Sequence, residues 1–133
     1  MIRRPPRSTL DRSSAASDVY KRQNPYSLIA VEDLLSKFKK NIKIIQGDTN
    51  QILHEVSLKN VDFIFIDGGH DYKTVKNDLE QSFKMISKNG TILCDDWNLS
   101  QALGVREAIK DFSKEKNINF EIVHERFAQF NLQ

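Results

Sequence analysis

The sequence predicts an α/β fold in which helices flank a mainly parallel β-sheet. Short runs of β-branched and aromatic residues alternate along the chain with longer segments whose apolar residues recur at helical spacing. Two of the short runs, residues 61–66 and 91–94, are almost wholly apolar, which is typical of strands buried on both faces. Regular alternation of strands and helices favours one sheet with helices packed on it.

The predicted elements follow one another without repeats or low-complexity tracts after residue 23. A helix is expected over residues 28–38 and a short β-branched strand over 42–45. A short helix over 52–58 precedes the strand at 61–66. The remaining expected elements are a helix over 72–87 that Asn89-Gly90 ends, a strand at 91–94, a helix at 104–112, and strands at 120–123 and 127–132.

The composition is that of an ordinary globular domain. The chain has 133 residues, of which 39% are hydrophobic and 29% are charged. The single cysteine, Cys94, cannot form an internal disulfide, and no apolar run approaches the roughly 20 residues that a membrane-spanning helix needs. We therefore expect a cytoplasmic protein without a membrane partner.

The first 23 residues differ from the rest of the chain. They are rich in arginine, serine and proline, carry six basic and two acidic residues, and show no helical or strand period. The string PPRSTLDRSSAASDVYKRQ resembles the translated read-through of a sequencing adapter. The resemblance implies that residues 1–23 are a disordered, non-native tail and that authentic sequence begins near Asn24, with its upstream part missing. The basic charge of this tail then does not indicate a nucleic-acid partner.

Acidic residues follow three of the predicted strands. Asp48, Asp67 and the pair Asp95-Asp96 each come shortly after the end of one. Ligands of open parallel sheets bind outside the carboxyl ends of the strands, so these carboxylates are expected at one rim of the sheet. An aspartate in such a position is also a common helix N-cap, and for Asp48 both interpretations stay open.

The turn after residue 66 holds two candidate catalytic residues. Asp67 is followed by Gly68-Gly69, which let the backbone turn tightly and approach a ligand closely. Capping of the next helix is the alternative role for Asp67, but Asp71 lies in the better position for it. His70 is a candidate base or ligand, because histidine exchanges protons near neutral pH. Alternatively, it packs on the turn and donates a hydrogen bond to a carbonyl.

The Asp95-Asp96 pair points to a metal site. Two adjacent like charges repel each other, and a bound divalent cation would offset that cost. Carboxylate oxygens are the ligands that Mg²⁺, Mn²⁺ and Ca²⁺ prefer. In the alternative interpretation, one carboxylate caps a turn and the other is solvated. Trp97 would line or plug a pocket at this rim, whereas His54 and His124 are treated as background.

Residues 61–97, VDFIFIDGGHDYKTVKNDLEQSFKMISKNGTILCDDW, resemble the small-molecule O-methyltransferase-like branch of the class I S-adenosylmethionine-dependent methyltransferases. That branch has an aliphatic strand, then IDG-H-Y, then V-x-x-D-L, then a glycine before a second aliphatic strand ending in two aspartates and an aromatic residue. The resemblance extends more loosely from about residue 42 to residue 131. The matching positions are Asp67, His70, Tyr72, Val75, Asp78, Leu79, Gly90, Asp95, Asp96 and Trp97.

The resemblance implies a fold and a reaction. The family has a Rossmann-like sheet of seven strands in the order 3-2-1-4-5-7-6, mostly parallel with an antiparallel last strand. Residues 24–133 would be the C-terminal part of this domain and would supply strands 3 to 7. The reaction implied is transfer of a methyl group from S-adenosylmethionine to a hydroxyl group of a small molecule or sugar.

The resemblance also assigns roles to residues of the rim. Asp67 would lie under the methyl-transfer site, and we take His70 beside it as a second catalytic residue. S-adenosylmethionine would contact Asp67 together with a further set, Asp48, Thr49 and Tyr72. In metal-dependent relatives, the residues that match Asp67, Asp95 and Asp96 hold Mg²⁺ or another divalent cation, which would lower the pKa of the acceptor hydroxyl.

The chain departs from the family pattern in its first half. The glycine-rich loop after the first strand and the acid that holds the ribose hydroxyls have no counterpart here, so the chain alone is expected to be inactive. A metal-dependent phosphohydrolase is one alternative, but only Lys73 and Arg106 are near enough in sequence to bind a phosphate. A non-catalytic α/β module whose acidic residues are helix caps is the other. The acceptor and the oligomeric state are left open by the sequence.

Overall fold

The computed structural model describes residues 27–133, so the prediction of a disordered tail over residues 1–23 lies outside the described residues. The chain divides into two compact units, one ending at Gln46 and the other spanning Gly47–Gln133.

The first unit contains a short helical segment. Helix α2 covers Leu28–Leu34, and the hydroxyl of its N-cap, Ser27, accepts a hydrogen bond from the Ala30 amide at 3.2 Å. A turn of 3₁₀-helix, η2, follows at Ser36–Phe38. The helix predicted over residues 28–38 is therefore confirmed in position, although its last turn is tighter than an α-helix.

The strand predicted over residues 42–45 is wrong. These residues form neither helix nor strand, and the side chains of Ile42 and Ile45 remain exposed. A strand exists only when a neighbouring strand satisfies its backbone groups. The described part of this unit contains no second strand, so the β-branched run has nothing to pair with.

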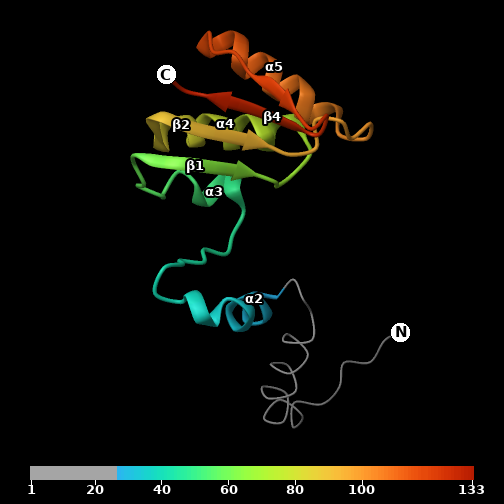
Figure 1. The fold of residues 1–133 in the computed structure, drawn as a ribbon. Helices are drawn as coiled ribbons and strands as arrows, with labels where there is room; N and C mark the ends of the chain where they lie inside the picture. Colours follow the sequence, from blue (N-terminus) through green and yellow to red (C-terminus); the bar gives the residue numbers. More distant parts are fainter. Residues whose placement is uncertain (1–26) are drawn as a thin grey trace, which may run out of the picture. The chain divides into compact units, whose positions relative to one another are not determined.

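The second unit is built on a four-stranded sheet in the order β1-β2-β4-β3 (Figure 1). Strand β1 covers Val61–Ile66 and runs parallel to β2, Ile86–Cys94. Strand β4, Phe127–Asn131, is antiparallel to β2 and to β3, Glu121–Val123. The predicted sheet, mostly parallel with an antiparallel last strand, is confirmed for these four strands.

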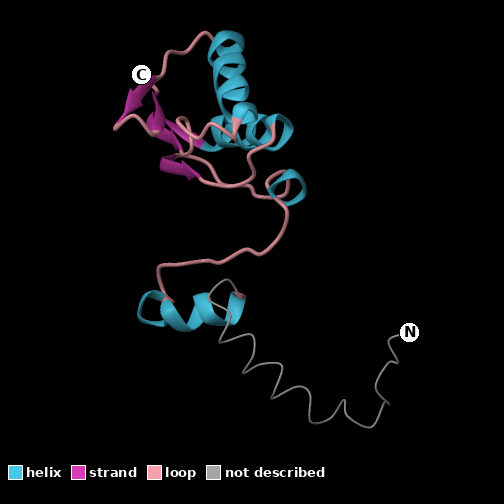
Figure 2. Ribbon diagram, turned by 90° about the vertical axis from the view of Figure 1, so that its right-hand side faces the viewer, coloured by secondary structure: helices cyan, strands magenta, loops and turns pink. Residues whose placement is uncertain are grey.

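Two long helices, α4 (Tyr72–Met85) and α5 (Leu103–Lys116), cover one face of this sheet, as Figure 2 shows. A third helix, α3, is only Thr49–Ile52 and starts earlier than the predicted 52–58. No helix within residues 27–133 is long and apolar enough to cross a membrane. The core between sheet and helices is centred on the largest fully buried side chains, Leu79, Ile92, Cys94, Ile109, Phe112 and Phe130.

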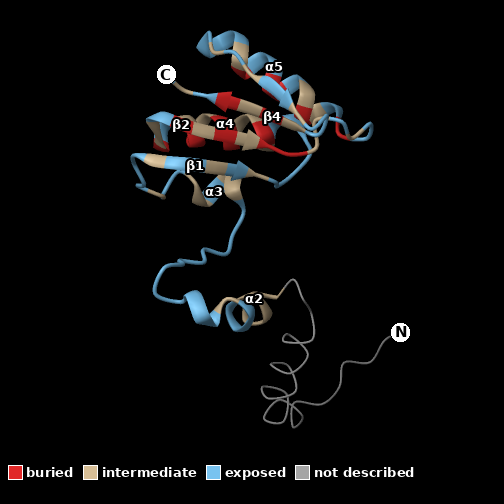
Figure 3. Cartoon of the chain, viewed as in Figure 1, coloured by how far each residue is buried: buried red, intermediate tan, exposed pale blue. Residues whose placement is uncertain are grey.

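Strand β1 is buried on one face only, which corrects the prediction that both faces are buried. Ile64 and Ile66 pack against the core, whereas Phe63 and Phe65 are 56% and 47% exposed. Figure 3 shows the contrast between exposed β1 and the buried segments of β2 and β4. An apolar run of this kind fits a strand buried on one face as well as one buried on both. Here β1 lies at the sheet edge, and no helix of this unit covers its second face.

Helix α4 ends at Met85, so Asn89-Gly90 does not end it as predicted. The chain passes directly into β2 at Ile86, and Gly90 lies inside that strand. A Cβ atom added to Gly90 would lie 2.6 Å from Cγ1 of Ile86. The glycine is therefore required by the close approach of the Ile86 side chain, and the pairing with β1 is irregular at the same place.

Candidate functional site

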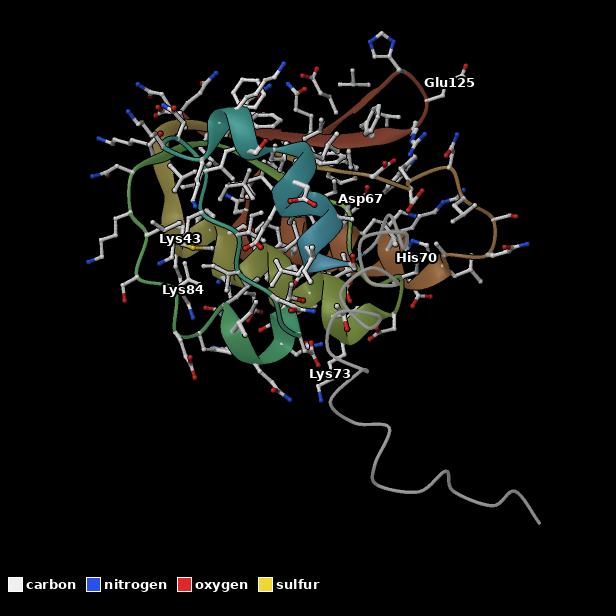
Figure 4. All side chains as sticks on the ribbon, turned by 90° about the horizontal axis from the view of Figure 1, so that it is seen from below. Lys43, Asp67, His70, Lys73, Lys84 and Glu125 are labelled. Carbon is white, nitrogen blue, oxygen red and sulfur yellow. The ribbon has the colours of Figure 1, made fainter. Side chains whose placement is uncertain are left out.

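The carboxyl ends of β1 and β2 bring four of the predicted site residues to one place. Asp67 and His70 follow β1, and Asp95 and Asp96 follow β2. The Asp95 amide donates to the Ile66 carbonyl at 2.9 Å, which holds the two strand ends together. All four residues, called the rim cluster below, line one small hollow. Figure 4 labels Asp67 and His70, with Glu125 at the tip of the β3–β4 hairpin.

The Asp95 carboxylate is buried and paired with Arg126. Nε and Nη2 of Arg126 lie 2.5 Å from Oδ1 and Oδ2 of Asp95, so the guanidinium contacts both carboxylate oxygens. The hydrogen bonds from Arg126 hold the pKa of Asp95 below its ordinary value, although burial acts in the opposite direction. Arg126 therefore offsets the repulsion that the sequence predicts within the Asp95-Asp96 pair.

Asp96 turns towards His70. Its φ of 63° is in the left-handed region, which few non-glycine residues adopt. Oδ2 of Asp96 lies 2.8 Å from Nε2 of His70, and the Asp96 amide donates to Oδ1 of Asp95 at 2.6 Å. The imidazole is thus held by a carboxylate and does not pack on the turn, the alternative that the sequence left open.

Asp67 is the exposed carboxylate of the rim cluster. Within residues 27–133 its carboxylate makes no hydrogen bond or ion pair, in contrast to Asp95 and Asp96. In the same range, no three His, Cys, Asp or Glu side chains lie close enough together to hold a metal ion. The three carboxylates predicted to bind a cation therefore share one hollow, but two of them already have other partners.

The turn that carries His70 is fixed from two sides. Asp71 caps α4 by accepting a hydrogen bond from the Thr74 amide at 3.0 Å, and hydrogen bonding to the Thr74 side chain and then to this amide lowers its pKa. On the other side, Gly104 at the start of α5 approaches the turn backbone. A Cβ atom at Gly104 would lie 2.5 Å from the Tyr72 amide nitrogen and 2.7 Å from the His70 carbonyl oxygen. Only glycine permits α5 to support the turn so closely.

The predicted cofactor residues other than Asp67 lie at the starts of two helices. Asp48 is the N-cap of α3 and accepts a hydrogen bond from the Asn50 amide at 2.9 Å. The Thr49 carbonyl accepts one at 3.3 Å from the Asn77 side chain, which ties α3 to α4. The Tyr72 hydroxyl donates to Asp111 at 2.9 Å, and this hydrogen bond raises the pKa of Tyr72. Tyr72 is thus attached to α5.

Two residues near the rim were not singled out as site residues by the sequence. Arg126 lies in the turn before β4. Its positive charge, complementary to the acidic rim, is the sequence signal that could have indicated its role there. Asp78 of α4 is buried, which raises its pKa, and its Oδ2 would lie 3.4 Å from a Cβ atom at Gly68. Trp97 packs on Phe120, with ring centroids 5.3 Å apart, and helps to attach the rim to the hairpin.

Comparison with known proteins gives the class to which this fold and rim belong. The methyltransferase domain family matches residues 9–97, which is well over half of the chain. The chain therefore belongs to this family. The sheet order β1-β2-β4-β3 with an antiparallel last strand corresponds to the last four strands of the class I, S-adenosylmethionine-dependent fold that the sequence resemblance implies.

A solved structure with the same fold is that of the O-methyltransferase NovP. It matches with a TM-score of 0.67 at 12% sequence identity, over 80% of this chain and 45% of NovP. The chain thus spans less than half the length of that protein. No curated protein sequence matches the chain significantly. Family membership and fold favour the methyltransferase interpretation over a phosphohydrolase or a non-catalytic module.

Proposed function

We propose that this chain is the C-terminal part of an enzyme that transfers the methyl group of S-adenosylmethionine to a hydroxyl of a small molecule or sugar. The observation that carries the proposal is the rim cluster, which gathers candidate bases at the carboxyl ends of two neighbouring strands in a methyltransferase domain. The proposed acceptor is neither nucleic acid nor a membrane component, and the proposed location is the cytoplasm.

The proposed reaction is a displacement at the methyl carbon. The acceptor oxygen forms a bond to that carbon, the bond from carbon to sulfur breaks, and S-adenosylhomocysteine leaves with the electron pair. The hydroxyl proton passes to a base on the enzyme. Such a reaction depends chiefly on holding donor and acceptor in line at close range.

His70 and Asp67 are the proposed proton acceptors. With Nε2 of His70 donating to Asp96 at 2.8 Å, Nδ1 is left to accept the proton of the substrate hydroxyl. Asp96 then orients the imidazole and stabilises the imidazolium that forms. Asp67 lies in the same hollow with its carboxylate exposed, and is the second group within reach of an acceptor there.

Divalent-metal assistance is a further part of the proposal. The rim cluster offers the oxygen-rich donor set that Mg²⁺ and similar ions prefer, and Asp67, Asp95 and Asp96 would hold the ion. When bound, it would favour ionisation of the acceptor hydroxyl. Within residues 27–133 no three of these donors lie close enough together to hold an ion, so binding would require Asp95 to exchange Arg126 and Asp96 to rearrange against His70.

Cofactor binding by this chain alone is proposed to be weak. Asp48, Thr49 and Tyr72 would contact the adenine side of S-adenosylmethionine, but the sequence offers no counterpart of the glycine-rich loop or the ribose-binding acid. We expect binding no tighter than the millimolar range, about −4 kcal/mol, and no turnover. Titration calorimetry of the 133-residue chain with S-adenosylmethionine measures this directly, and micromolar binding would contradict it.

The activity itself is tested in a longer protein that joins the genomic upstream sequence to these residues. Asp67→Asn and His70→Gln should each lower kcat by about 10²–10⁴, the usual contribution of a general base. His54→Gln is the matched control, since His54 lies outside the rim cluster. A longer protein that fails to bind S-adenosylmethionine, or one in which all three variants are fully active, would overturn the proposed function.

A further inference from the structure

The N-caps of α3 and α4, Asp48 and Asp71, are joined by hydrogen bonds that pass through Asn50 and Thr74. The side-chain amide of Asn50 donates to Oδ1 of Asp48 at 3.2 Å and to Oγ1 of Thr74 at 3.0 Å. The Thr74 hydroxyl donates in turn to the Asp71 carboxylate, which also accepts a hydrogen bond from the Thr74 amide at 3.0 Å. These four residues, called the cap bridge below, connect one helix start to the other.

The two uncharged side chains of the cap bridge have all their donors in use. A threonine hydroxyl has one donor, and in Thr74 it goes to Asp71, while the hydroxyl oxygen accepts from Asn50. The two side-chain N–H groups of Asn50 go to Asp48 and Thr74. The direction of each hydrogen bond is therefore fixed, and loss of the Thr74 hydroxyl or the Asn50 amide would interrupt the cap bridge.

Thr74 also supports the rim turn, residues 67–71, which links β1 to α4. A Cβ atom at Gly69 would lie 3.0 Å from Cγ2 of Thr74 and 3.4 Å from its Cβ. The Gly69 backbone therefore packs directly on the methyl end of the Thr74 side chain. Thr74 contacts the rim turn with its methyl group and, through Asp71, with its hydroxyl, and it reaches α3 with the same hydroxyl.

Helix α3 depends on α4 for its position. It has only four residues, Thr49–Ile52, and a helix this short is not stable by itself in water. Besides the cap bridge, the Asn77 side chain donates to the Thr49 carbonyl at 3.3 Å. Asn77 lies three positions after Thr74, so both residues are on the same side of α4. That side of α4 therefore holds the start of α3 through two separate contacts.

We infer that Thr74 is a positioning residue, which fixes the start of α3 relative to the rim turn through the cap bridge. This inference rests on the proposed function, in which Asp48 and Thr49 contact the adenine side of S-adenosylmethionine and the rim turn carries the proposed proton acceptors. The two ends of the cofactor are then placed by segments that the cap bridge joins. In-line methyl transfer depends on this placement, because a small displacement of the methyl carbon lowers the rate steeply.

The link itself is tested by amide NMR spectra of the 133-residue chain, which need no activity. Thr74→Val keeps a methyl group beside Gly69 and removes the hydroxyl, whereas Asn50→Ala interrupts the cap bridge from the α3 side. Both variants should broaden the amide signals of Gly69 and His70 through exchange on the μs–ms timescale. Thr74→Ser keeps the hydroxyl and should leave these signals as sharp as in the parent chain.

The functional consequence is measured in the longer protein that includes the genomic upstream sequence. Thr74→Val and Asn50→Ala should each lower kcat about ten- to hundredfold, while the KM for S-adenosylmethionine changes by less than about threefold. Thr74→Ser should stay within about threefold of the parent kcat. A loss confined to KM would mean that the cap bridge only helps to bind the cofactor, and it would overturn the inference.

Thr91→Val is the matched control. Thr91 of β2 also makes a hydrogen bond between side chains, to Asn131 at 3.0 Å, but it does not line the rim hollow. Its replacement should change neither the Gly69 amide signal nor kcat. Equal effects of Thr91→Val and Thr74→Val would overturn the inference. A Thr74→Ser variant as impaired as Thr74→Val would do the same, because packing of the methyl group would then explain the effect.

Failure of the inference differs from failure of the proposed function. A longer parent protein that transfers no methyl group rejects the proposed function and the inference with it. An active parent whose Thr74→Val and Asn50→Ala variants keep full kcat rejects the inference alone, and so do variants with a lowered kcat but unbroadened Gly69 signals. Circular dichroism shows whether each variant is folded. Because Thr74 and Asn50 lie on different helices, either variant decides the question if the other does not fold.

Discussion

Strands β1 and β2 pair with each other in parallel, and each ends in an aspartate at the rim, yet their surroundings differ. Strand β2 has β1 on one side and β4 on the other, so Ile92 lies between Ile64 and Phe130. Strand β1 has a neighbour on one side only. The same difference continues into the site, because Asp95 after β2 is buried and paired, while Asp67 after β1 is exposed.

The comparison shows that position in the sheet, and not the apolar run itself, decides what a strand contributes. Strand β1 and the last four residues of β2, 91–94, both have the largely apolar composition of a sheet centre. Only β2 has the neighbours that turn this composition into burial. A carboxylate beyond a central strand needs a specific counter-charge, whereas one beyond an edge strand is solvated.

Thiol reactivity should show the largest difference between the strands. Burial raises the pKa of Cys94 at the end of β2 to about 12, so at pH 8 only about 10⁻⁴ of the thiol is ionised. In a Cys94→Ala background, the substitution Phe65→Cys places a thiol at an exposed position of β1. We expect it to react with a disulfide reagent about 10³ times faster than native Cys94. Equal rates would mean that β2 opens as readily as β1.

Replacing the paired isoleucines by alanine should show how much more the core of β2 contributes to stability than that of β1. Ile92 is fully buried and Ile64, its partner in the sheet register, is only partly buried. Ile92→Ala should lower the free energy of unfolding by about 2–5 kcal/mol, the range for a buried isoleucine. Ile64→Ala should cost clearly less. Urea denaturation followed by circular dichroism measures both, and a cost for Ile64→Ala equal to that for Ile92→Ala would remove the distinction.

Acid should remove a stabilising contribution at the end of β2. Arg126 lowers the pKa of Asp95 in the folded chain. The stabilising contribution is therefore fully present above pH 3.8, the pKa of an aspartate in the unfolded chain, and it is lost as pH falls through the lower pKa of the folded chain. Arg126→Gln should therefore be less stable than the parent at pH 7, and the difference should shrink below pH 3.8. Urea midpoints at pH 7 and pH 3 measure it, and a difference that grows in acid would contradict the sign.

The exposed edge of β1 should make the chain self-associate. Phe63 and Phe65 lie on an uncovered face, and the outer backbone groups of an edge strand can pair with another chain. We expect concentration-dependent association that Phe63→Lys reduces several-fold, with little change in stability. Sedimentation velocity measures the effect. As a control, Lys88→Ala removes an exposed charge at β2, and an equal reduction there would argue against the β1 edge.

The sequence predicts some parts of this molecule because they depend on local patterns. The apolar spacing of α4 and α5 identifies two helices that pack on one sheet, and Asp71 is recognisable as a cap from its place before Tyr72. Where a prediction is wrong, the outcome depends on partners distant in sequence. Residues 42–45 form no strand because the described part of their unit, from residue 27 on, holds no neighbouring strand, and β1 is half exposed because of its place in the sheet order.

In the functional site, too, some features depend on local sequence and others on residues distant in the chain. Local motifs bring Asp67, His70, Asp95 and Asp96 to one hollow, as parallel strand ends must. Their individual partners were not predictable, because the Asp95 contact comes from Arg126, 31 positions later in the chain. The roles of these residues, and of Asp48, Thr49 and Tyr72, in catalysis and in cofactor or metal binding remain predictions.

The place of β4 between β2 and β3 sets the order in which the chain becomes stable during synthesis. Ala128 and Phe130, which lie in the core, are made after every other strand and helix of the unit. Until they leave the ribosome, β2 has no second neighbour and Asp95 has no counter-charge. The nascent chain therefore keeps one edge of β2 unpaired until β4 has been synthesised. Over that interval it is most exposed to aggregation and to chaperone binding.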